Sequence, residues 1–130
     1  MATIEKFEDL KVWKEARLLS KSIYSVTQKE FLNDFDLIRQ IRRSSGSVMD
    51  NIAEGFERGG KGEFIQFLGI AKGSCGEVRS QLYRAHDQGY ITNDKFKELY
   101  DQAIEIGKMI GGFIKYLRNS EYKGLKYKEG

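Results

Sequence analysis

The sequence of 130 residues has no proline, one cysteine and one histidine. A single cysteine excludes an internal disulfide, and therefore a secreted domain stapled by disulfides. One cysteine and one histidine also supply too few nitrogen and sulfur ligands for a transition-metal site. We expect neither a metal nor another cofactor.

Long uncharged stretches are missing as well. The longest run without Asp, Glu, Lys or Arg is Phe64 to Ala71, whereas about 20 apolar residues are needed to cross a bilayer. Near the N-terminus, Glu5, Lys6 and Glu8 lie where a signal peptide would need an apolar segment. We therefore expect a cytoplasmic protein with no membrane partner.

Apolar residues recur at helical spacing along most of the chain. The pattern predicts helices from Leu10 to about Gln28, Asp36 to about Arg58, Lys61 to Gln88, and Thr92 to about Arg118. Each segment carries one apolar stripe, and short connections favour antiparallel neighbours. The fold class is therefore all-α, an up-down-up-down four-helix bundle over residues 1–118, followed by a flexible polar tail at 119–130.

Local signals support these boundaries. Asp9 is a suitable N-cap for the first helix. Gly59, Gly60 and Gly62 separate the second helix from the third, and Gly89 ends the third. No stretch alternates apolar and polar residues, so a sheet is not expected.

A row of glycines marks a second face on the third helix. Gly62, Gly69, Gly73 and Gly76 lie nearly opposite the apolar stripe. A glycine inside a helix costs about 0.5 to 1 kcal/mol relative to alanine, and a smooth strip lets another helix approach closely. The row predicts a homo-oligomer with this face at the subunit contact. The alternative is a set of tolerated surface glycines.

The net charge is +3 and the pI is about 8.9. The basic residues form small groups of the kind that contact phosphates, although ordinary solvated helix faces look the same. Arg42 and Arg43 have a further alternative, an ion pair with Asp50 or Glu54. The candidate nucleic-acid-binding residues are Lys14, Arg17 and Lys21 on the first helix, Arg42 and Arg43 on the second, and Lys72 and Arg79 on the third.

One pair of residues resembles a catalytic arrangement. Some helical-bundle ribonucleases place an arginine a few residues before a histidine, and Arg79 and His86 lie two turns apart on one predicted helix. The spacing arises often by chance in a chain with eight arginines. We therefore assign no catalytic residue and keep a metal-independent ribonuclease as an alternative.

Several segments carry a family resemblance. Phe7–Trp13 (FEDLKVW), Gln40–Ser44 (QIRRS), Asn51–Gly55 (NIAEG) and Glu63–Leu68 (EFIQFL) resemble the four-helix-bundle proteins encoded in intervening sequences of 23S ribosomal RNA genes. The resemblance implies a bacterial homopentamer with no established enzymatic activity and an association with RNA or an RNA-handling protein.

The resemblance also singles out residues of the second helix. It directs attention to Arg42, Arg43, Asn51, Glu54 and Gly55. Asn51 and Glu54 can hydrogen-bond between helices and Gly55 permits close approach, which is compatible first with a structural role. We also place these three among the candidate residues of the oligomer interface. A more distant similarity, to accessory proteins of diversity-generating retroelements, implies the alternative of a nucleic-acid-binding partner for a reverse transcriptase.

Overall fold

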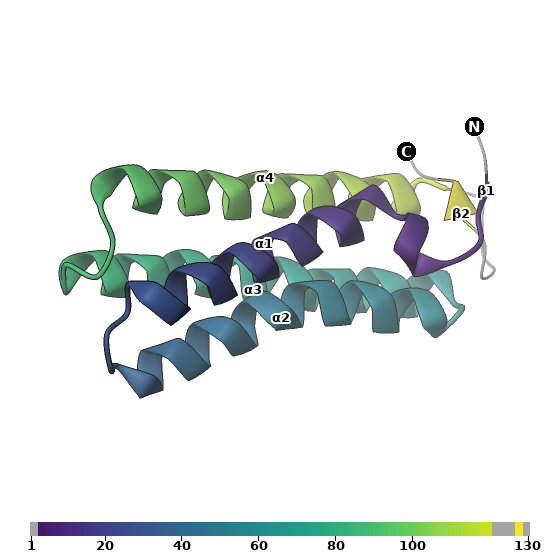
Figure 1. Ribbon diagram of the computed structural model, residues 1–130. Helices are drawn as coiled ribbons and strands as arrows, with labels where there is room; N and C mark the ends of the chain where they lie inside the picture. Colours follow the sequence, from purple (N-terminus) through teal and green to yellow (C-terminus); the bar gives the residue numbers. More distant parts are fainter. Residues whose placement is uncertain (1–2, 121–126, 129–130) are drawn as a thin grey trace.

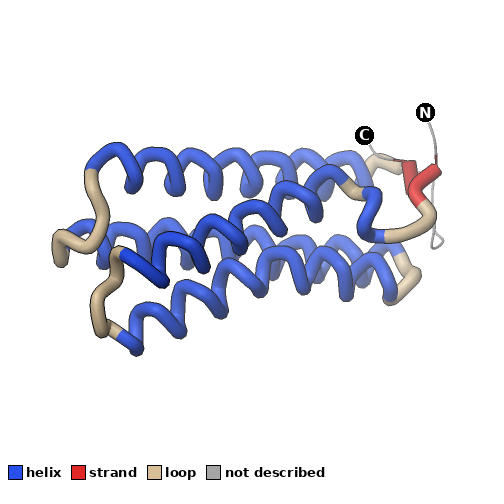
Figure 2. The backbone as a smooth tube through the Cα atoms, in the orientation of Figure 1, coloured by secondary structure: helices blue, strands red, loops and turns tan. Residues whose placement is uncertain are grey.

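A computed structural model describes residues 3–120 and 127–128 of the chain. Four helices make up the body: α1 (Lys11–Lys29), α2 (Phe35–Glu57), α3 (Lys61–Asp87) and α4 (Asn93–Arg118) (Figure 1). Each helix packs on the next, and α1 also packs against α4, which closes the ring. Figure 2 shows the short connections between antiparallel neighbours. The predicted all-α, up-down-up-down four-helix bundle is confirmed.

Three short elements lie at the ends of the chain. A 3-10 helix, η1 (Phe7–Asp9), precedes α1, and β1 (Thr3–Ile4) pairs antiparallel with β2 (Tyr127–Lys128). The expectation that the chain has no strand was therefore wrong for two residues at each end, which are too few to show alternation. Most of the predicted tail, 121–126 and 129–130, lies outside the described residues.

The core is built from the predicted apolar stripes. All the residues of the predicted stripes are buried except Trp13 and Phe96, which are half-buried against the core. The buried ones are Leu10, Val12, Ala16, Leu19, Ile23 and Val26 of α1 and the residue before it, Leu37, Ile41, Val48, Ile52 and Phe56 of α2, Phe64, Leu68, Ala71, Cys75, Val78, Leu82 and Ala85 of α3, and Leu99, Ala103, Ile106, Ile110, Phe113 and Leu117 of α4. The Phe64 ring of α3 packs between two other rings. Its centroid lies 5.9 Å from that of Phe56 and 5.3 Å from that of Phe113. The hydrophobic effect on these four faces therefore determines which side of each helix turns inward.

The helix ends differ in detail from the sequence prediction. Thr92, where the sequence predicts the start of the last helix, is the N-cap of α4, since its hydroxyl accepts from the Lys95 amide at 3.1 Å. Asp9 does not cap α1, because it belongs to η1 and Leu10 occupies the N-cap position. Gly59 ends the α2 segment with φ of 89°. Gly62, expected in the same break, instead lies within the first turn of α3.

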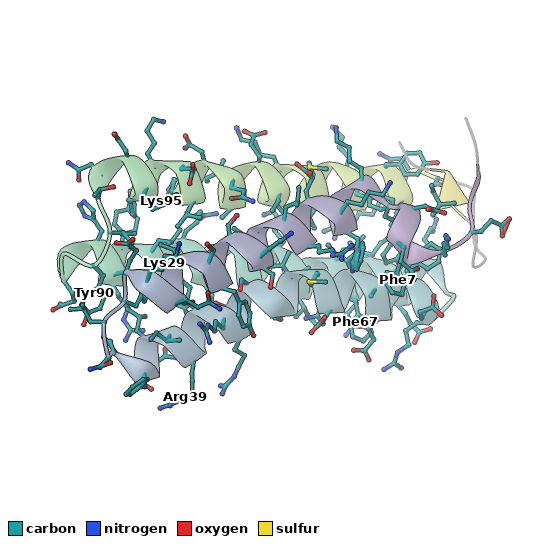
Figure 3. All side chains as sticks on the ribbon, viewed as in Figure 1. Phe7, Lys29, Arg39, Phe67, Tyr90 and Lys95 are labelled. Atoms are coloured by element: carbon teal, nitrogen blue, oxygen red, sulfur yellow. The ribbon has the colours of Figure 1, made fainter. Side chains whose placement is uncertain are left out.

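Two loops are clamped together at one end of the bundle. Asp34 caps α2 by accepting from the Leu37 amide at 3.1 Å, and its other carboxylate oxygen accepts from the Tyr90 hydroxyl at 2.9 Å. The Tyr90 ring also contacts Phe31, with centroids 5.6 Å apart. Tyr90 therefore connects the α3–α4 loop to the α1–α2 loop (Figure 3).

No helix in the described part of the chain is apolar over a bilayer-spanning length.

Candidate nucleic-acid interface

The predicted basic residues are all at the surface, on three of the four helices. Arg42 and Arg79 are partly buried, and the others are exposed. The salt bridges of the described residues involve other cations, among them Arg58, Lys95 and Lys97. The positive charge of the predicted residues is therefore not neutralised by a carboxylate contact within the described part of the chain. These residues are Lys14, Arg17, Lys21, Arg42, Arg43, Lys72 and Arg79.

Arg42 and Arg43 border a hollow on α2 that faces solvent. The hollow has a volume of about 660 Å³, and a third arginine, Arg39, also lines it. Figure 3 shows Arg39 projecting outward from α2. Asp50 is the one acidic residue in the lining, so three guanidinium groups face a single carboxylate there. The remaining lining residues are Tyr24, Gly46, Ser47 and Asn51.

The guanidinium of Arg42 is held in place by α1. Its Nε donates to Thr27 Oγ1 at 2.9 Å, and the Thr27 hydroxyl donates in turn to the Ile23 carbonyl at 2.8 Å. The guanidinium carbon also lies 4.5 Å from the centroid of the Tyr24 ring. These contacts leave the terminal nitrogens of Arg42 without a partner in the described part of the chain. Arg42 is thus a pre-oriented donor rather than a mobile surface cation.

A buried polar seam fixes α2 against α3 behind this hollow. The Ser44 hydroxyl donates to Gln81 Oε1, and the Ser74 hydroxyl donates to Ser47 Oγ at 2.9 Å. Ser44, Ser74 and Gln81 are all buried, so these hydrogen bonds give partners to polar groups that water does not reach. Sequence reasoning missed this seam, because small polar residues within an apolar pattern give no sign of their partners.

Three residues expected at an oligomer interface make contacts within the chain. Asn51 Nδ2 donates to the Ser47 carbonyl at 2.8 Å on its own helix. Glu54 pairs with Arg58 at 2.9 Å, one turn along α2. Gly55 is buried, and a Cβ there would lie 2.6 Å from Phe67 Cβ. Gly55 therefore packs against α3 of the same chain, and a place for these three residues at a subunit contact stays a prediction.

The glycine row of α3 does face away from the core. A Cβ added at Gly62, Gly69, Gly73 or Gly76 would meet no atom within 4 Å. No other part of the same chain therefore packs closely against the row. This openness agrees with the predicted outer face, and it leaves the oligomeric state a prediction.

A groove between α3 and α4 continues this row. It has a volume of about 400 Å³, and its lining includes Lys72, Arg79 and Lys108 but no acidic residue. Lys108 also lies 3.6 Å from Glu105 one turn away. Glycines of both helices form much of the floor, so a ligand backbone can approach closely. These glycines are Gly76, Gly107, Gly111 and Gly112.

Behind this groove lies the cysteine of the chain. Burial raises the pKa of the Cys75 thiol from 9.0 to about 11, although the positive charges of Arg79 and Lys72 act in the opposite direction. The thiol is therefore protonated at neutral pH and serves as core packing. In the described part of the chain, no three His, Cys, Asp or Glu side chains gather where they could hold a metal ion.

A third hollow, between α1 and α4, has mixed charge. Its volume is about 640 Å³, and Lys21 lines it together with the Lys29 and Lys95 labelled in Figure 3. Glu30 and Glu98 also line it, and Lys95 Nζ contacts Glu98 at 2.8 Å. The predicted Lys21 therefore faces a partly neutralised surface. The α2 hollow and the α3–α4 groove have the clearer positive charge.

The Arg79 and His86 pair lies on α3, as the sequence predicted. The Arg79 guanidinium lies 5.8 Å from the Tyr100 ring centroid. His86 Nε2 is hydrogen-bonded to Asn93 Oδ1, and its ring lies 5.1 Å from Phe96. Arg79 lines the α3–α4 groove whereas His86 does not. The structure therefore gives the two side chains different partners.

Comparisons with known proteins agree with this architecture. The model of one protein family, described as 23S rRNA-intervening sequence protein, matches residues 8–112. A crystal structure of a protein of unknown function from the S23 ribosomal protein family of Bacteroides thetaiotaomicron is similar, with 27% identity and a TM-score of 0.70. The similarity covers 80% of this chain and 98% of that one. A comparison with curated proteins finds no match.

The family match includes the segments that build the α2 hollow and the α3–α4 groove. It ends at Gly112, the last residue of the groove lining. The matched residues include α1, α2 and α3 and most of α4. The chain belongs to the 23S rRNA-intervening sequence protein family.

Proposed function

We propose that this chain is a non-enzymatic, homo-oligomeric bundle that binds RNA in the cytoplasm through its basic surface. The observation that carries the proposal is the α2 hollow, where Arg42 is pre-oriented and Arg39 and Arg43 lie beside it. Arginine presents a planar set of donors that matches phosphate oxygens. Because the family description refers to 23S rRNA, we choose ribosomal RNA as the first ligand to test.

The proposal assigns binding rather than cleavage. His86 and Arg79 contact Asn93 and Tyr100, and His86 does not line the groove that Arg79 lines. We expect RNA to be recovered intact after incubation with the protein. Cleavage that His86→Ala abolishes would instead support the ribonuclease alternative.

The binding test is a salt titration with a labelled RNA stem-loop. Replacing phosphate counterions makes the logarithm of the association constant fall linearly with the logarithm of salt concentration. The double variant Arg42→Gln/Arg43→Gln should bind more weakly at every salt concentration. Its slope should be less steep by about 1 for each phosphate that the variant no longer neutralises. The measurement is fluorescence anisotropy across a salt series.

The matched control is Lys95→Gln/Lys97→Gln, which removes the same charge from α4. Both lysines already contact carboxylates, Glu98 and Asp101, at 2.8 Å. We expect this control to bind almost like the wild type. Salt-independent binding by the wild type, or equal losses of affinity in the two variants, would show that the arginines form no specific site.

A further inference from the structure

An aromatic cluster occupies the α3–α4 surface near the loop that joins these helices. The Phe96 ring is stacked on Tyr100, with centroids 5.4 Å apart and an interplanar angle of 29°. Tyr83 of α3 contacts both rings, at 4.9 Å from Phe96 and 5.8 Å from Tyr100. His86 completes the cluster, with its ring centroid 5.1 Å from that of Phe96. Four rings from two helices thus form one continuous group.

The cluster is not covered by the rest of the bundle. Tyr83 is 51% exposed, and Phe96, Tyr100 and His86 are partly exposed. The Tyr83 ring contacts Phe96 and Tyr100 on α4, and about half of the residue remains open to a ligand.

Positive charge lies directly beside these rings. Arg79 belongs to both features, because its guanidinium lies over Tyr100 and it also lines the α3–α4 groove. Lys72 and Lys108 line the same groove, and no acidic residue does. The surface therefore combines exposed rings with a basic, glycine-lined channel. This combination is typical of proteins that bind single-stranded nucleic acids, whose bases stack on rings while the phosphates follow a positive groove.

We propose that the α3–α4 surface binds unpaired nucleotides of RNA, with a base stacked on Tyr83 and the phosphates running past Arg79 into the groove. This inference rests on the proposed function and specifies a second site with a preference for single strands. A second copy of the chain is the competing occupant of a glycine-lined surface. Charge favours the RNA, because the groove presents Lys72, Arg79 and Lys108 to a ligand and the chain itself is positive.

The test compares three labelled probes of about 12 nucleotides, within the range that single-strand sites cover. The probes are an oligouridylate, a base-paired RNA duplex, and an abasic strand with the same phosphates. Tyr83→Ala should weaken binding of the oligouridylate by roughly 5- to 150-fold, the range for losing one stacking ring. Binding of the duplex and the abasic strand should be nearly unchanged.

Tyr83→Phe is the matched control, since it retains the ring and removes only the hydroxyl. It should bind the oligouridylate like the wild type. A thermal melt of each variant checks that α3 and α4 remain packed. Arg42→Gln/Arg43→Gln should weaken binding of all three probes, because each carries phosphates and the two arginines belong to the α2 hollow.

The outcomes separate the two proposals. If the wild type binds none of the probes, the proposed RNA-binding function is wrong. If the wild type binds with a salt slope but Tyr83→Ala weakens all probes equally or none, the function stands and the stacking site is wrong. A drop in native mass in Tyr83→Ala, with unchanged binding of the oligouridylate, would assign the surface to contact between subunits.

Discussion

Single glycines in this protein have opposite structural roles, which the residue letter alone does not reveal. Gly55 allows α2 and α3 to approach so closely that a Cβ would lie 2.6 Å from Phe67 Cβ. Gly46, nine residues earlier on the same helix, has open space where its Cβ would be. Close packing leaves little room for relaxation in the first case, whereas helix propensity dominates in the second.

We therefore expect Gly55→Ala to destabilise the fold by about 1 to 3 kcal/mol, the usual cost of overpacking a core. Gly46→Ala is the control and should be neutral or stabilising by about 0.5 to 1 kcal/mol, because alanine favours the helix. Urea unfolding at one fixed protein concentration measures both changes. Equal stabilities of the two variants would mean that α3 moves aside at no cost.

The sequence predicted those features that each helix determines by itself. Apolar spacing identified the buried faces, including Leu68, Cys75 and Ile110, because burial and the helical repeat determine them locally. The Arg42 contact with Thr27 joins α1 to α2, and the Tyr83 cluster joins α3 to α4. Such pairs depend on how far one helix slides along the next, which side-chain packing decides and spacing does not encode.

At the scale of the elements, the contact between Asp34 and Tyr90 connects the α1–α2 loop to the α3–α4 loop. Asp34 both caps α2 and accepts from Tyr90. The hydrogen bond to Asp34 raises the pKa of the Tyr90 hydroxyl above its ordinary value. A raised pKa means that this contribution to stability is present below the ordinary tyrosine pKa, and it disappears as the pH rises through the raised value.

Asp34→Ala should lower the free energy of unfolding by about 1 kcal/mol through loss of the cap, and by more if the Tyr90 bond contributes. Tyr90→Phe keeps the cap and the ring contact with Phe31, so its effect should be smaller. Adding Tyr90→Phe to Asp34→Ala should cost little further, because the bond is already absent. Additive losses in this double-mutant cycle, measured by urea unfolding, would show that the two side chains act independently.

At the scale of the whole molecule, the open glycine row determines how copies of the chain can meet. Gly69 and Gly73 have open space beside them, and Ile70 between them is 47% exposed. A smooth strip beside an exposed apolar side chain suits close packing of helices from two subunits. The row meets the α3–α4 groove at Gly76, whereas Tyr83 lies two turns further along α3.

Gly73→Arg should break the proposed assembly, because a long charged side chain would stand in the subunit contact. Light scattering should give a native mass several times 15.0 kDa for the wild type, with five copies expected from the family resemblance, and a smaller mass for the variant. Gln28→Arg adds the same charge to an exposed position of α1 and should leave the mass unchanged. An unaltered mass in Gly73→Arg would exclude the row from the interface.

The short ladder of β1 and β2 brings the two ends of the described chain together, at the end of the bundle opposite the α3–α4 loop (Figure 1). An even number of antiparallel helices returns the chain to the side where it began. A domain or label fused beyond either end is therefore tethered at the same place, far from the exposed rings near the loop.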